Sequence, residues 1–560
     1  MAHTIQGILG PFARILESKV LLVHQSAKDF LLGTDRIYDS FPTLRTINKE
    51  NAELQMSISC IRYLMLEDFS KDFFSIENSP VESIYESSDG SSSGIGRGFS
   101  ESESDLHLDQ LYCEPGNLSE EAYQSLASKY RLYSYASSHW TEHFALCESS
   151  APIWLKDAAK TLLDVKIANC RNWLYFYWAD VGAAMNQDPT GFDQLTLAAF
   201  FNLHETLTGL LSQGASQRGK DQALFWASRR GNCRILARLL EAGANPNAQG
   251  PEVHTGLTAA AAHSHLDCVN TLLADARTDP NVRARNGRSA LSYACGNGHT
   301  EMVKVLLDQG GCGAGETDNS GATPLFWAVG GGHKTIISDL ARLPGVDINH
   351  RDKAGRTIVS WAACYGTEEV LSCVLRLRGI DANSKDKEGL SPLSLAARYG
   401  RTAAVAILVG NRKVDKASTD RNKRNAISWA CGRGHVDALR ILLSGGCPGV
   451  DDEDVNGWTP LAWAIQNNVP EIIKTLLSTG NVDLERRDMG GRTALYWAVD
   501  YGHAPVVKVL LQEGADPQLT TNDGRTPVML ARSYGRDDMV DLLLSYSDHG
   551  VVHPNFVRPT

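Results

Sequence analysis

The sequence lacks any long apolar run. No stretch approaches the roughly 20 apolar residues that a membrane-spanning helix needs, and no basic segment followed by an apolar one marks a secretion signal at the N-terminus. The twelve cysteines are scattered, and none forms a C-x-x-C pair. We therefore expect no membrane span, and we expect reduced thiols in a cytoplasmic protein, with the nucleus as the other compartment where thiols stay reduced.

Positive charge is also in short supply. The chain has 54 basic and 65 acidic residues and a net charge of −11, which disfavours nucleic acid as a partner because phosphate neutralisation needs a basic surface. No cysteine has the local setting of a nucleophile, and no motif indicates a cofactor. We expect neither a cofactor nor a small-molecule substrate. The 560 residues exceed what a single core can bury.

What the sequence does have is an internal period. An alanine recurs with seven consecutive steps of 34 residues between Ala260 and Ala498, flanked by steps of 33 and, at the start, 29. A fixed period of this length is the signature of a repeat architecture. Ten repeats are clear and one degenerate repeat precedes them, aligned on these alanines: Ala198, Ala227, Ala260, Ala294, Ala328, Ala362, Ala396, Ala430, Ala464, Ala498 and Ala531.

Glycine and aspartate recur at fixed distances from this alanine. Glycine stands seven residues before the alanine in seven repeats and four residues after it in eight, where it suits a turn and a helix end. Six successive repeats place aspartate ten residues before the alanine, where its carboxylate can accept backbone N–H groups across the turn: Asp318, Asp352, Asp386, Asp420, Asp454 and Asp488. Each repeat therefore predicts a turn, a short helix, a second turn, a longer helix and a loop.

The segment Gly457-Trp-Thr-Pro-Leu-Ala-Trp-Ala464 resembles the G-x-T-P-L-x-x-A signature of ankyrin repeats, and Gly298-His-Thr-Glu-Met-Val303 resembles its continuation. The resemblance covers about residues 191–545 and implies an all-α solenoid of about eleven repeats. The repeat around Lys423 has lost both the glycine and the T-P pair. Tryptophan precedes the alanine in six repeats, where we interpret it as a structural column rather than a ligand platform: Trp226, Trp327, Trp361, Trp429, Trp463 and Trp497.

The N-terminal third predicts separate segments. Residues 79–110 are Ser-rich and acidic, and this composition predicts a disordered linker. Residues 22–31 and 135–143 are similar to two segments of fungal-type NACHT–ankyrin proteins, one from the winged-helix region after the NTPase and one from the helix before the repeats. The resemblance implies a winged-helix or helical remnant over 1–78 and a helical region over 111–190, without the NTPase, and residues 546–560 would then be a C-terminal tail.

One pattern offers an enzymatic alternative. His139, Glu142 and His143 fit the H-x-x-E-H motif of inverted zinc proteases, and the two histidines fall on one helix face. No third ligand is identifiable, so we expect a packed helix and no metal site. Histidines that recur at one position of the repeats are interpreted as structural as well: His265, His299, His333, His435 and His503.

We expect a non-enzymatic sensor or adaptor that binds protein partners, with a zinc hydrolase and a passive scaffold as the alternatives. Repeat proteins of this type offer extended binding surfaces. The turns of the central repeats carry cations although the whole chain is acidic, which suggests a partner with an acidic segment. The candidate binding residues beside the turn aspartates and glycines are Arg351, Lys353, Lys385, Lys387, Arg421, Lys423 and Arg424.

Overall fold

The computed structural model describes residues 13–16, 19–22, 49–66, 69–70, 131–181, 191–250, 254–309 and 311–547. The predicted linker 79–110, most of 1–78 and most of the tail lie outside these residues. The chain forms two compact units, Met1–Asp279 and Pro280–Thr560, and each is described by itself. No helix of the described part is long and apolar enough to cross a membrane.

The first compact unit begins with two short strands. Strand β1 (Ala13–Leu16) pairs with β2 (Lys19–Leu22) in an antiparallel arrangement that places Ala13 opposite Leu22. The apolar residues from Val20 predict a strand, and the pattern that follows up to Gly33 predicts a helix. The strand is partly confirmed, whereas the helix lies outside the described residues. These strands add a small β element to a structure that is otherwise helical in its described part.

Four helices of the N-terminal third share one core. Helix α3 (Lys49–Leu64) packs on α5 (Arg131–Cys147) and α6 (Ile153–Leu162), and α5 packs on α7 (Ala168–Val181). The buried rings of Trp140 and Trp173 meet edge to face at 5.2 Å between centroids. Asn169 Nδ2 donates to the carbonyl oxygen of Leu64 at 2.8 Å. Residues on both sides of the predicted linker therefore build a single helical region.

This helical region covers the first helix pair of the repeat array, α8 (Gln194–Phe200) and α9 (His204–Ser212). The buried carboxylate of Glu148 accepts the backbone N–H of Thr206 at 2.6 Å and that of Glu205 at 3.0 Å, at the start of α9. Trp178 packs against Phe200 of α8. Because an end repeat has an apolar face without a neighbouring repeat, the helical region acts as an N-terminal cap.

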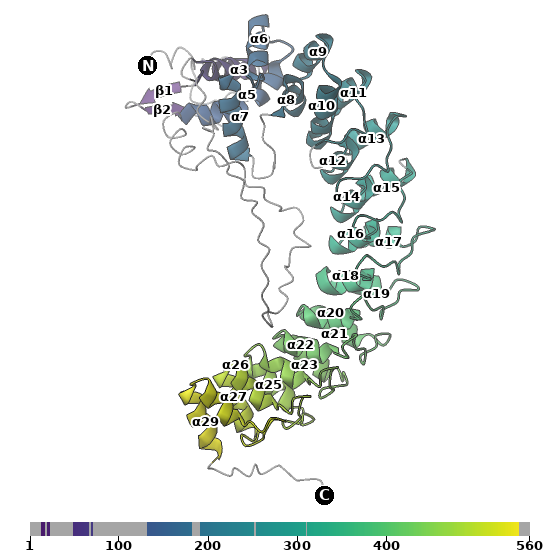
Figure 1. Ribbon diagram of the computed structural model, residues 1–560. Coiled ribbons are helices and arrows are strands. Elements are labelled where there is room, and N and C mark those ends of the chain that lie inside the picture. The colour runs from purple at the N-terminus through teal and green to yellow at the C-terminus, as the bar shows by residue number, and fades with distance from the viewer. Residues whose placement is uncertain are drawn as a thin grey trace, which may run out of the picture. The chain divides into compact units, whose positions relative to one another are not determined.

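The described part of residues 191–547 holds eleven helix pairs, the number that the sequence predicts (Figure 1). After α8, the first helices are α10 (Gln217–Arg230) and α12 (Gly256–Ala262), followed in the second compact unit by α14 (Ala290–Gly296), α16 (Pro324–Gly330), α18 (Ile358–Tyr365), α20 (Pro392–Arg398), α22 (Ala426–Gly432), α24 (Pro460–Ile465), α26 (Ala494–Tyr501) and α28 (Pro527–Ser533).

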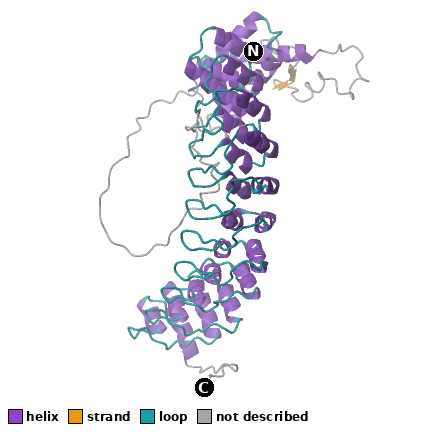
Figure 2. Cartoon of the chain, turned by 90° about the vertical axis from the view of Figure 1, so that its right-hand side faces the viewer, coloured by secondary structure: helices purple, strands orange, loops and turns teal. Residues whose placement is uncertain are grey.

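After α9, the second helices are α11 (Cys233–Glu241) and α13 (Leu266–Ala274), followed by α15 (Thr300–Asp308), α17 (Lys334–Leu340), α19 (Glu368–Leu375), α21 (Thr402–Gly410), α23 (Val436–Ser444), α25 (Pro470–Leu477), α27 (Ala504–Gln512) and α29 (Asp537–Ser547). Within the second compact unit, first helices contact first helices and second helices contact second helices of the next repeat. In the middle of this unit, the loops between repeats project to one side of the stacked helices (Figure 2).

The residues that begin and end the helices of each repeat adopt the conformations that the sequence predicts. In α24, the Thr459 hydroxyl accepts the N–H of Ala462 and Pro460 occupies the first turn, where a missing N–H costs nothing. All seven glycines that precede the alanine by seven residues have positive φ. So do seven of the eight that follow it by four; Gly366, with φ −75°, is the exception. The all-α repeat solenoid is therefore confirmed.

Candidate functional site

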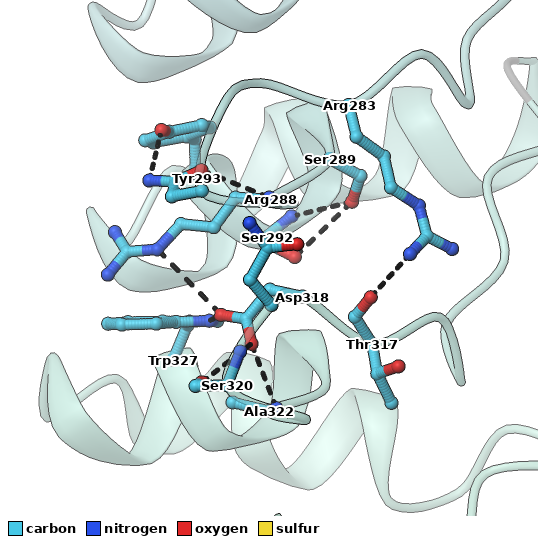
Figure 3. A network of polar contacts seen from close by, with 12 residues as sticks. Arg283, Arg288, Ser289, Ser292, Tyr293, Thr317, Asp318, Ser320, Ala322 and Trp327 are labelled. Atoms are coloured by element: carbon cyan, nitrogen blue, oxygen red, sulfur yellow. Dashed lines mark hydrogen bonds and ion pairs between the residues drawn. The ribbon is translucent and has the colours of Figure 1, made fainter. Parts of the chain in front are cut away.

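The candidate site lies on the turns that precede the first helices of the central repeats. In the repeat shown in Figure 3, Oδ1 of the buried Asp318 accepts the backbone N–H of Ser320 at 2.8 Å and that of Ala322 at 3.0 Å. Its Oδ2 accepts the indole N–H of Trp327 at 2.9 Å, and Arg288 of the preceding repeat lies 4.0 Å from the same oxygen. The aspartate thus joins a turn to the helix that follows it.

The Asp–Trp hydrogen bond recurs in five repeats at a spacing of nine residues. The Nε1–Oδ2 distances lie between 2.9 and 3.1 Å, for Trp327–Asp318, Trp361–Asp352, Trp429–Asp420, Trp463–Asp454 and Trp497–Asp488. The sequence predicts the backbone bonds of these aspartates but not the indole donor. Five of the six tryptophans thus hold the turns, while Trp226 is buried against Phe192 and Phe200.

Arg424 is the one candidate binding residue that is buried. Only 8% of it is exposed, and its guanidinium carbon lies 3.6 Å from the ring centroid of Trp429 and 3.7 Å from that of Trp463. Burial lowers the pKa of Arg424 to about 10. The cation stacks between two aromatic faces and joins two successive repeats, so its geometry is that of a structural residue.

Two further candidates contact the next turn. The guanidinium of Arg351 donates to the carbonyl oxygen of Lys385, and Lys385 Nζ in turn donates to the carbonyl oxygen of Thr419 at 2.6 Å. Arg283 and Arg487 make the same kind of contact, to Thr317 and Thr520. These side chains are exposed, but each of them donates a hydrogen bond to a carbonyl oxygen of the next repeat.

The remaining candidate binding residues have side chains that are exposed to solvent at the turns. Lys353, Lys387 and Arg421 each donate a backbone N–H to a carbonyl of the preceding turn, at 2.8, 2.9 and 3.2 Å, which confirms that successive turns stack side by side. Their exposed side chains make no hydrogen bond or ion pair with the described residues. Lys423 is exposed too, but it takes the glycine position of its repeat with φ +62°.

The sequence interpretation missed the rest of this surface. The residue after the turn aspartate is Asn319, Lys353, Lys387, Arg421, Val455 and Met489 in six successive repeats, and we call these residues the tip row. Val455 is 41% and Met489 is 74% exposed. Three cations are therefore followed by two exposed apolar side chains in one register. Comparing this position across the 34-residue period would have revealed the pattern.

The acidic neighbours do not neutralise the tip row by direct pairing. Asp352 and Asp420 bind backbone N–H groups and indoles, Asp386 binds only backbone N–H groups, and Glu388 forms an ion pair with Arg398 at 2.9 Å. Burial raises the pKa of Asp386 above its usual value. The tip-row cations thus face outward without a carboxylate partner among the described residues.

The recurring histidines link repeats. Nε2 of His265, His333 and His435 lies 3.0, 2.9 and 3.1 Å from a carbonyl oxygen at the end of the first helix in the preceding repeat. Arg401 makes the equivalent bond to the Cys364 carbonyl at 2.6 Å. The same position thus accepts different donors, as expected for a structural role.

His143 also has a structural partner. Its Nδ1 lies 2.6 Å from Oε2 of Glu53, and both residues are buried between α3 and α5. Burial lowers the pKa of His143, and the Glu53 carboxylate opposes that shift in part. Glu142 is exposed. No group of three or more side chains that could hold a metal ion occurs among the described residues.

These features define a helical-repeat protein, in which helix pairs stack through their apolar faces and turn tips line up along one edge. The chain belongs to the ankyrin-repeat family. A family model of three ankyrin repeats matches residues 257–352, 332–420, 412–488 and 481–553, and a single-repeat model matches residues 220–251. The helix pair α8–α9 precedes all of these matches.

Comparison with solved structures finds the ankyrin repeat domain of Bcl-3, described as a unique member of the IkappaB protein family. It is 24% identical, the match covers 40% of this chain and 100% of that one, and the TM-score is 0.36. No curated protein matches this chain in sequence.

Proposed function

We propose that this chain is a non-enzymatic binding protein whose tip row holds an extended segment of a protein partner. The observation that carries the proposal is the order of side chains along one register: Lys353, Lys387 and Arg421, then Val455 and Met489. A complementary segment has acidic residues followed by an apolar residue. Membership in the ankyrin-repeat family supports a role in protein interaction.

The cations and the apolar residues of the tip row would contribute to binding in different ways. Exposed charges at an interface mainly set the association rate and its sensitivity to salt, whereas an apolar side chain that becomes buried slows dissociation. The cations would therefore attract an acidic segment, and Met489 would retain it. Backbone bonds between successive turns hold the three cations and Val455 in a fixed order, so the partner need only present its residues in the matching sequence.

We further propose that the chain acts as a sensor or adaptor in nonself recognition or signalling, in the cytoplasm. This step rests on the resemblance of residues 22–31 and 135–143 to NACHT–ankyrin proteins. Residues 135–143 lie within α5, which packs in the helical region that caps the first repeats. A passive scaffold would have the same repeats without a signalling partner.

The test uses a labelled synthetic peptide with a run of glutamates followed by leucines, together with a peptide in which the same residues are scrambled. We expect the ordered peptide to bind more tightly. Changing Lys353, Lys387 and Arg421 to glutamate should slow its association and reverse the salt dependence, because salt then screens a repulsion, with an unchanged melting temperature. Changing Met489 to serine should speed dissociation instead.

A matched control makes the same change of net charge elsewhere. Arg376, Lys474 and Lys508 are exposed cations on or directly after the second helices and make no ion pair with the described residues. Their replacement by glutamate should leave the association rate almost unchanged. Equal effects of the two triple variants, or equal binding of the two peptides, would exclude the tip row as the binding surface.

A further inference from the structure

Two thiols face each other between the second helices of consecutive repeats. Cys233 begins α11 and Cys268 lies in the first turn of α13, and their sulfur atoms are 2.9 Å apart. The two helices pack against each other within the first compact unit. Disulfide formation requires the sulfur atoms to approach by about a further 0.9 Å, since an S–S bond is close to 2.05 Å long.

The two thiols differ in access. Cys268 is fully buried, whereas Cys233 is partly exposed. Burial is the main cause that raises the pKa of Cys268, and the adjacent Cys233 adds to the shift. Since the thiolate is the form that reacts with oxidants, Cys268 is protected from direct attack. Cys233 is the thiol that an oxidant in solution can reach.

We propose that Cys233 and Cys268 form a peroxide-responsive disulfide that links two consecutive ankyrin repeats. Cys233 attacks one oxygen of hydrogen peroxide, so that an S–O bond forms, the O–O bond breaks and one water leaves. The Cys268 sulfur then attacks the sulfenic acid of Cys233. The S–S bond forms, the S–O bond breaks, and the Cys268 proton leaves with the hydroxyl as a second water. The two thiols lose two electrons in total, and peroxide receives them.

The link has a structural consequence. In a repeat array each repeat is held by its neighbours, so a covalent bond between α11 and α13 restrains the opening of both. The repeats near the N-terminal cap should therefore become more rigid under oxidising conditions, and a reductant should reverse the change. The device does not depend on which partner the tip row binds.

The experiment treats the purified full chain with hydrogen peroxide, blocks the remaining thiols by alkylation and maps the peptides by mass spectrometry. We expect a peptide pair joined through Cys233 and Cys268 that dithiothreitol separates. Hydrogen exchange of α11 and α13 should slow after oxidation and recover after reduction. A link to another cysteine, or oxidation of Cys233 to the sulfinic acid without a link, would overturn the proposal.

Three variants separate the roles. Cys268→Ser should leave Cys233 as a sulfenic acid that dimedone traps, and Cys233→Ser should leave Cys268 unoxidised. Cys373 is the matched control, because it is also partly exposed and its sulfur lies 3.9 Å from the Ser338 hydroxyl rather than beside a thiol. Cys373→Ser should leave the link intact. Dimedone labelling of Cys233 to the same extent in the wild type and in Cys268→Ser would contradict the resolving role of Cys268.

Discussion

The indole nitrogen of Trp361 donates a hydrogen bond of 2.9 Å to Oδ2 of Asp352, nine residues earlier in the same repeat. The other carboxylate oxygen accepts the N–H of Arg356 at 2.8 Å. Both oxygens of Asp352 therefore act as acceptors. An amide at this position would have one acceptor and one donor, so one of the two N–H groups would face another donor.

Asp352→Asn should therefore destabilise the protein by about 1–3 kcal/mol, the cost of an unsatisfied buried donor. Asp386→Asn is the matched comparison, since Leu395 stands where other repeats have tryptophan. The backbone donors Glu388 and Leu390 both use Oδ1 of Asp386, so an amide can keep these bonds. We expect a change within about 0.5 kcal/mol at neutral pH.

The pH dependence of the two variants should differ as well. The pKa of Asp386 is raised in the folded state, so its charged form is unfavourable at neutral pH, and that cost disappears as the pH falls through the folded-state pKa. Asp386→Asn should remove this gain in stability at low pH. Urea unfolding at pH 7 and pH 4 measures both effects, and equal losses in the two asparagine variants would contradict the role of the indole bond.

Lys423→Gly should stabilise the array. Lys423 has φ +62° at a position where seven other repeats have glycine, and a side chain in this region costs roughly 1–2 kcal/mol, partly offset by the greater chain entropy of glycine. We expect a gain of about 1 kcal/mol in the free energy of unfolding. Lys353→Gly, at the tip row of another repeat, should bring no gain, and a loss of stability in Lys423→Gly would refute the argument from backbone strain.

Gly298→Ala should cost more than Gly332→Ala. Both glycines follow a first helix with positive φ, +80° and +86°. A Cβ on Gly298 would meet the ring of His333 in the next repeat, whereas a Cβ on Gly332 would have nothing within 4 Å. The backbone cost of roughly 1–2 kcal/mol is common to both, so the difference between their melting temperatures reports the contact with the ring. Equal melting temperatures would show that His333 moves aside freely.

Gly298 also illustrates what sequence can and cannot predict. The 34-residue period predicts the helix pairs, the turn glycines and the backbone bonds of the aspartates, because each of these features depends on residues that are a few positions apart in the sequence. The contact between Gly298 and His333, the Asp–Trp bond and the burial of Arg424 between two rings depend on side-chain directions or on packing between repeats. Arg424 therefore looked like an exposed cation in the sequence.

Trp463→Ala should destabilise the array locally. The half-buried ring lies against the Arg424 guanidinium, contacts the tilted ring of Trp458 and donates to Asp454 at 3.0 Å. Its loss should cost about 3 kcal/mol, the lower end for deletion of a large aromatic side chain, and hydrogen exchange should rise around residues 430–500 because coupling is between nearest neighbours. Trp463→Phe keeps the ring and should cost less. A uniform rise in exchange over residues 285–540 would contradict nearest-neighbour coupling.

The helical region should lose stability when the pH falls below about 6.5, the ordinary pKa of histidine. The folded-state pKa of His143 is lowered, first because the ring is buried, while Glu53 opposes the shift in part. The unfolded state therefore binds a proton at a higher pH than the folded state does. The stability that the neutral ring contributes is present above about pH 6.5 and is lost as the pH falls toward the folded-state value.

Hydrogen exchange of α3 and α5 between pH 8 and pH 5, corrected for intrinsic exchange rates, measures this loss. His143→Gln can still donate to Glu53 and should flatten the dependence, whereas His139→Gln should leave it in place. An unchanged pH profile in His143→Gln would assign the dependence to another group.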